Sequence, residues 1–131
     1  MKIMMAVVVI LGMNVLAFAH EHALTPEMRR QHNAMSVTEK QWAACKKNLA
    51  SGNLAAAGKA LGQVQKASAG LEKFKLHRNA DKMDEFNEQG RSFRNNLARL
   101  ADVLKAKKRG EVSGLVEAID NSCTQCHEAF R

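Results

Sequence analysis

The chain contains a single proline, Pro26, so no later residue imposes the break that proline causes in a helix. Thr25, Pro26 and Glu27 together resemble a helix start, with a hydroxyl cap, a first-turn proline and a first-turn acid. We predict a first helix over about 26–50, ending at Ser51-Gly52-Asn53, and a second over about 54–76. Because no stretch shows convincing strand alternation, the pattern excludes a sheet protein.

The second half of the chain carries an unbroken helical pattern. Apolar or small residues recur there at alternating spacings of three and four: Met83, Phe86, Gly90, Phe93, Leu97, Leu100 and Leu104. This is the pattern of a helix that packs one seam in a bundle. We expect Asp81 to cap this helix, Gly110 to end it and a fourth helix to cover about 111–130. Four amphipathic helices with short links predict an all-α protein, an antiparallel up-down-up-down four-helix bundle.

The first nineteen residues have the features of an export signal. Lys2 precedes an apolar run over 3–17, and Ala17-Phe18-Ala19 has the small residues of a cleavage site. The run is short for a membrane span and contains Asn14. We therefore predict a cleaved signal peptide over 1–19 and a single domain over 20–131, exported to the periplasm.

Near the C-terminus stands the sequence Cys123-Thr124-Gln125-Cys126-His127. Cys-x-x-Cys-His is the attachment signature of a c-type haem. Two thiols three residues apart on a helix can form thioethers with the two vinyl groups of one porphyrin, and His127 then becomes the proximal ligand of the iron. The motif lies on the inward stripe of the predicted fourth helix, so one haem c, covalently attached, is expected inside one end of the bundle.

A zinc site that uses the same thiols is a weaker alternative. Cys45 is the third cysteine of the chain, and it should lie toward the opposite end of the first helix. Four zinc ligands are therefore hard to assemble. We expect Cys45 to be a small buried apolar residue.

The last nine residues, Cys123-Thr124-Gln125-Cys126-His127-Glu128-Ala129-Phe130-Arg131, resemble the ending of the cytochrome c′ family, and Arg30-Gln31 resembles the propionate-side pair on its first helix. This resemblance implies that Arg30 and Arg131 contact the haem propionates. Typical family members have a five-coordinate iron that binds nitric oxide or carbon monoxide. Close relatives carry a methionine on the first helix as the sixth ligand and transfer electrons.

The residue over the distal face of the iron decides between these two branches. Met35 lies on the predicted core seam, close to where the family places its distal residue, and Met28 is the alternative. In strict register from Arg30-Gln31, Ala34 occupies that place. We expect a one-electron carrier with His127 and Met35 as axial ligands; the alternative is a five-coordinate gas binder.

The composition also bears on partners. The formal net charge is +7, with basic clusters at Lys46-Lys47 and over 105–109. Such a surface suits an acidic or membrane-bound redox partner, although the cations over 105–109 also suit a helix end. Nucleic acid is not expected, and no residue set suggests an enzyme. Ala55, Gly58 and Gly62 form a small-residue strip that would permit either a homodimer through the first two helices or close internal packing.

Overall fold

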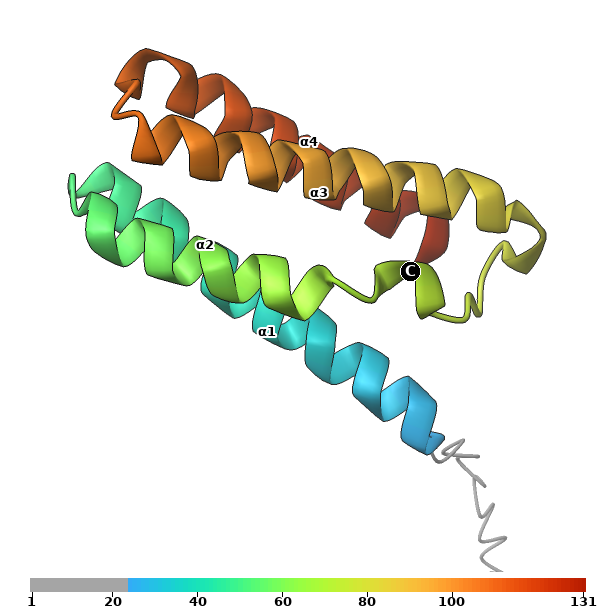
Figure 1. Cartoon of the computed structure of the whole chain (residues 1–131). Helices are drawn as coiled ribbons and strands as arrows, with labels where there is room; N and C mark the ends of the chain where they lie inside the picture. Colours follow the sequence, from blue (N-terminus) through green and yellow to red (C-terminus); the bar gives the residue numbers. More distant parts are fainter. Residues whose placement is uncertain (1–23) are drawn as a thin grey trace, which may run out of the picture.

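The computed structural model describes residues 24–131, and the predicted signal peptide over 1–19 lies outside this range. Four α-helices follow one another in the order α1 (Pro26–Ala50), α2 (Leu54–Ser68), α3 (Met83–Lys105) and α4 (Val112–Phe130). The α1–α2 pair lies beside the α3–α4 pair, and successive helices run in opposite directions (Figure 1). Residues 24–131 contain no strand. The predicted all-α four-helix bundle is confirmed.

The first helix has the predicted ends. The Thr25 hydroxyl accepts a hydrogen bond from the Met28 amide at 3.1 Å, which satisfies one free donor of the first turn. At the other end Gly52 has φ +76°, a left-handed conformation that costs glycine little. Asn53 then caps α2 by accepting from the Ala56 amide at 3.1 Å.

The predicted second helix is too long. α2 ends at Ser68, and a 3-10 turn, Leu71–Lys73, replaces its last part. The Ser68 hydroxyl donates to the carbonyl of Gln65 at 3.3 Å, and Gly70 follows two residues later. A hydroxyl that competes for main-chain groups and a flexible glycine both favour ending the helix here.

Both predicted boundaries of the third helix are also wrong. Asp81 lies in the 3-10 turn Ala80–Lys82, and Lys82 occupies the cap position of α3 without a side-chain hydrogen bond. At the far end α3 stops at Lys105, well before Gly110. Lys107, with φ +57°, takes the left-handed position that glycine usually fills.

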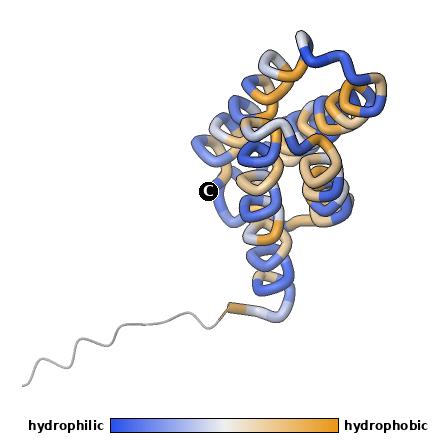
Figure 2. The backbone as a smooth tube through the Cα atoms, turned by 90° about the vertical axis from the view of Figure 1, so that its left-hand side faces the viewer, coloured by the Kyte–Doolittle hydropathy of each residue, from blue (hydrophilic) through white to orange (hydrophobic). Residues whose placement is uncertain are grey.

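The core is formed by the inward faces of all four helices. It contains Trp42, Cys45, Ala57, Ala60, Leu61, Val64, Leu71, Phe93, Leu97, Leu100, Val103, Leu115 and Ile119. The helices carry both hydrophobic and hydrophilic residues (Figure 2), as expected for helices that bury one side against the core. Among the described helices none is long and apolar enough to cross a membrane.

The small-residue strip of α2 faces outward. Ala55, Gly58 and Gly62 are exposed, and a Cβ atom added at either glycine would meet no atom within 4 Å. Close internal packing is therefore wrong as the reason for these glycines. The homodimer through α1 and α2 stays a prediction.

The two ends of the bundle differ. Both tight turns, between α1 and α2 and between α3 and α4, lie at one end, which we call the turn end (Figure 1). The other end holds the start of α1, the end of α4 and the longer connection between α2 and α3 over 69–82. The first turns of α1 project beyond the other helices at this open end (Figures 1 and 2).

Candidate haem site at the open end

The haem motif lies within regular helix near the end of α4. Cys123 packs against the core cluster, and Cys126 and His127 are half-buried. Thr124 lies between the two cysteines, and its hydroxyl donates a hydrogen bond to the carbonyl of Asp120 at 3.1 Å. This polar side chain is exposed, so it does not compete with the two thiols for the inner face of the helix. Neither thiol is in a disulfide. Both are therefore available to one ligand at the same end of the bundle.

The surroundings keep both thiols neutral. Burial raises the pKa of Cys123 to about 11, and the negative charge of Asp120 acts in the same direction. Burial also raises the pKa of Cys126. Zinc binding would have to remove both protons, which these raised pKa values disfavour. Residues 24–131 also contain no group of three or more His, Cys, Asp or Glu residues placed to hold a metal ion.

The start of α1 contributes a polar atom that lacks a partner. Gln31 is 8% exposed, and its Nε2 is buried without a hydrogen-bond partner among the described residues. Gln31 lines a cavity of about 210 Å³ together with Thr25, Glu27, Met28, Lys75 and His77. A buried amide donor without an acceptor is costly, and a haem propionate is an acceptor. This donor therefore fits a haem propionate, although no residue of the haem motif lines the cavity.

The connection between α2 and α3 joins the two sides of the open end. Its Lys75 and His77 line the cavity beside α1, and Lys75 Nζ lies 3.2 Å from Glu27 Oε2. The next two residues, Arg78 and Asn79, donate hydrogen bonds to the main chain at the end of α4. One short segment thus contacts both helices between which the haem is expected.

A polar bridge joins the middle of α1 to α4. Trp42 Nε1 donates to Asp120 Oδ1 at 2.7 Å, and Lys46 Nζ lies 2.9 and 3.0 Å from the two oxygens of the same carboxylate. These hydrogen bonds lower the pKa of Asp120 against the opposing effect of its partial burial. Lys46 also lies 5.7 Å from the centre of the Trp42 ring. The bridge fixes how α1 and α4 are aligned.

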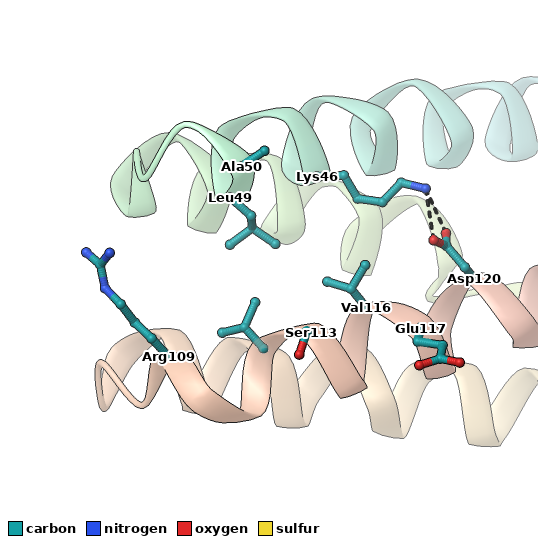
Figure 3. Close-up of a pocket in the computed structure, with 9 residues that line it drawn as sticks. Lys46, Leu49, Ala50, Arg109, Ser113, Val116, Glu117 and Asp120 are labelled. Carbon is teal, nitrogen blue, oxygen red and sulfur yellow. Dashed lines mark hydrogen bonds and ion pairs between the residues drawn. The ribbon is translucent and has the colours of Figure 1, made fainter.

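A larger cleft of about 510 Å³ lies beside this bridge, toward the turn end. Figure 3 shows Lys46 and Asp120 meeting across it, with Leu49 of α1 and Val116 of α4 directed toward each other. Its lining, which begins at Arg109 and ends at Asp120 on the α4 side, contains no residue of the haem motif. Because it lies toward the turn end, the cleft is separate from the candidate haem site at the open end.

The structure distributes the other predicted site residues over the same end. Met28 lines the smaller cavity, and Met35 packs against the core cluster. Arg30 and Arg131 are exposed, and the main-chain oxygen of Arg131 accepts a hydrogen bond from Arg78. Their predicted contacts with propionates stay predictions.

Sequence reasoning missed the partners of the site. Asp120, three residues before Cys123, was visible as a charge on the haem helix, but its bond to Trp42 spans 78 residues. Asn79 carried no signal beyond its place in a polar connection.

Residues 79–131 match the family model described as Cytochrome C'. The match covers α3, α4 and the whole haem motif, and it supports the predicted resemblance to the cytochrome c′ family. Neither the curated proteins nor the solved structures gave a match. The family consists of c-type cytochromes that carry electrons or bind gases, generally without catalysis, and it implies a covalently bound haem c.

Proposed function

We propose that the protein is a periplasmic monohaem electron carrier in which His127 and Met35 bind the iron from opposite faces. Cys123 and Cys126 would attach the haem, and Gln31, with Arg30 and Arg131, would hold its propionates. When bound, the haem supplies the one-electron couple of its iron. The family is typically periplasmic, in agreement with the signal peptide predicted over 1–19.

The observation that carries this proposal is the alignment of α1 and α4 at the Trp42–Asp120 bridge. Toward the open end, Met35 lies seven residues from Trp42, and His127 lies seven residues from Asp120. Seven residues make about two helical turns, roughly 10 Å along each helix. Met35 is therefore on the same face of α1 as Trp42, and His127 is on the same face of α4 as Asp120. Antiparallel helices that are aligned at the bridge would bring Met35 and His127 to matching levels.

The same alignment favours Met35 over Met28. Met28 lies fourteen residues from Trp42, which corresponds to a level beyond the end of α4 at Phe130. Ala34 lies one residue further from the bridge than Met35 and points about 100° away from it around the helix. Met35 is thus the α1 side chain best aligned with His127.

One observation favours the second candidate function, a five-coordinate gas binder. Met35 packs against the core cluster in the structure, so its thioether lies in an apolar environment and does not need the iron as a partner. If it keeps this position in the haem-loaded protein, the distal face is open to nitric oxide or carbon monoxide.

The deciding experiment is an optical spectrum of the haem-loaded protein, oxidised and reduced, before and after carbon monoxide is added. The proposal predicts sharp, split reduced bands without a response to the gas. Met35→Ala should convert the spectrum to a high-spin form that binds carbon monoxide, whereas the matched control Met28→Ala should not. A wild-type spectrum that is high-spin and shifts with carbon monoxide would establish the second candidate instead.

The open end carries exposed acids, such as Asp81, Asp84 and Glu85, as well as exposed bases, so an acidic redox partner would dock on the basic residues among them. Exposed basic side chains there include Arg29, Arg30, Arg78 and Lys82. Charges at the rim of a docking surface mainly raise the association rate at low salt. Reduction by an acidic partner should therefore slow as salt is raised, and Arg29→Glu should slow it further.

A further inference from the structure

The α2–α3 connection holds the last turn of α4 by side-chain hydrogen bonds. Arg78 Nη1 donates to the main-chain oxygen of Arg131 at 2.9 Å, and Asn79 Nδ2 donates to the carbonyl of Ala129 at 2.5 Å. We call these two bonds the α4 clamp. Beside them Phe86, at the start of α3, packs edge-to-face on Phe130, with ring centres 5.3 Å apart.

Asn79 takes an unfavourable backbone conformation to make its bond. Its φ and ψ angles are 53° and 45°, in the left-handed region, where a residue other than glycine is strained by about 1–2 kcal/mol. Asparagine tolerates this region better than most residues. Its side chain does not cap the 3-10 turn that follows but reaches a carbonyl 50 residues away. The conformation is therefore used for a contact with α4.

The place where the clamp acts is the turn that begins at His127. The Arg131 amide donates to the carbonyl of His127 at 3.1 Å, so one main-chain hydrogen bond closes the turn over 127–131. The last carbonyls of a helix lack partners within it, and a terminal turn frays when nothing holds it. Ala129 and Arg131 receive such partners from the clamp.

We propose that Arg78 and Asn79 are positioning residues for His127, which fix the last turn of α4 and thereby the orientation of the imidazole toward the haem. The inference rests on the proposed role of His127 as the proximal ligand. Groups that orient an axial histidine tune the metal that it binds. Without the clamp the turn frays, and the ring of His127 samples a wider range of orientations.

Two substitutions at one position separate the hydrogen bond from the backbone. Asn79→Gly relieves the left-handed strain but removes the donor, and Asn79→Asp keeps size and backbone tolerance but replaces the donor with an acceptor. A purely conformational role predicts that Gly is harmless. The clamp predicts that both variants lose the contact with Ala129.

Lys107→Gly is the matched control. Lys107 is the other residue in 24–131, apart from glycine, with positive φ, and it lies at the turn end. This variant relieves the same kind of strain far from α4's last turn. Any change that it shares with Asn79→Gly is due to strain relief and not to the clamp.

The test measures two properties of the haem-loaded protein. Amide hydrogen exchange at Phe130 and Arg131 should become about tenfold faster in both Asn79 variants, the factor expected for one lost hydrogen bond. The nuclear magnetic resonance signals of the His127 ring in the oxidised protein should shift or broaden in the same variants. Both properties should be unchanged in Lys107→Gly.

Unchanged exchange and unchanged His127 signals in both Asn79 variants would overturn the inference alone. Failure of the proposed function has a different signature: His127→Ala would leave the wild-type optical spectrum intact. If exchange quickened while the His127 signals stayed fixed, the bonds would be only structural, and the positioning role would be overturned.

Discussion

The turn end and the open end of the bundle are held together by different kinds of contact. At the turn end α1 and α3 stop in the same way, with a left-handed residue, Gly52 or Lys107, and main-chain bonds back to the preceding turn. The Asn53 amide donates to Asn48 at 2.9 Å, and the Lys108 amide donates to Val103 at 3.1 Å. At the open end the corresponding bonds run from side chains to carbonyls 50 or more residues away.

Particular residues of the two ends also differ in burial. Leu100, toward the turn end, is fully buried, whereas Met28, Cys126 and His127 at the open end are only partly covered. At the turn end, the packing of apolar helix seams and the two tight turns are enough to hold a helix bundle together. The open end instead presents thiols, an imidazole and an unpartnered amide, which together suit a bound group. The comparison predicts that Leu100 contributes more to stability than the partly covered site residues of the open end do.

The largest expected effect tests this prediction directly. Leu100→Ala should lower the free energy of unfolding by about 2–5 kcal/mol, because it leaves a cavity at a fully buried site. Met28→Ala, its counterpart at the open end, should cost under about 1 kcal/mol, because Met28 is already partly exposed. Urea unfolding of the haem-loaded variants measures both. Equal losses would show that the open end contributes as much packing as the turn end.

The next effect concerns the bridge that Asp120 of α4 forms with Trp42 and Lys46 of α1. Asp120→Ala should cost about 1–3 kcal/mol, because the Nε1 donor of Trp42, a residue only 6% exposed, loses its acceptor. Asp120→Asn keeps an oxygen for Trp42 and loses only the pairing with Lys46. Since both partners of that pair are about 40% exposed, its loss should cost no more than about 1 kcal/mol. If Asp120→Asn were as damaging as Asp120→Ala, the ion pair and not the Trp42 bond would hold the helices.

The same carboxylate predicts a pH dependence. Hydrogen bonds from Lys46 and Trp42 lower the pKa of Asp120 in the folded protein. Its contribution to stability is therefore present above the unfolded pKa, about 3.9, and is lost as the pH falls through the lower folded value. Unfolding free energies of wild type and Asp120→Asn should converge below about pH 4. If the difference in unfolding free energy between the two proteins stayed constant from pH 7 to pH 3, the ionised Asp120 carboxylate would not be the source of this stability.

Local features at both ends were largely predictable from the sequence, and contacts between distant segments were not. The limits of α1 followed from Thr25, Pro26 and Gly52, since caps and left-handed glycines act on their immediate neighbours. The motif Cys123-Thr124-Gln125-Cys126-His127 also fixed which helix carries the site. By contrast, the bond from Asn79 to Ala129 depends on how two distant segments meet, which no local pattern specifies.

The errors at helix boundaries have the same origin. Gly110 was expected to end α3, because glycine favours the left-handed position that follows a helix. The helix ends at Lys105 instead, and Lys107 adopts that position at a cost in strain. The turn to α4 is thus set by where the two helices pack, and local preference gives way to it.

The smallest expected effect is a gain at this turn. Lys107→Gly removes the left-handed strain, about 1–2 kcal/mol, but gives the unfolded chain more freedom, so the net stabilisation should be about 0.5–1 kcal/mol. Thermal unfolding of the haem-loaded protein measures it, with Lys108→Gly as the control, because Lys108 has φ −82° and gains no relief. If Lys107→Gly stabilises the protein while Asn79→Gly does not, the two left-handed residues differ as the comparison requires: strain at the turn end is merely tolerated, whereas strain at the open end is offset by the bond to α4.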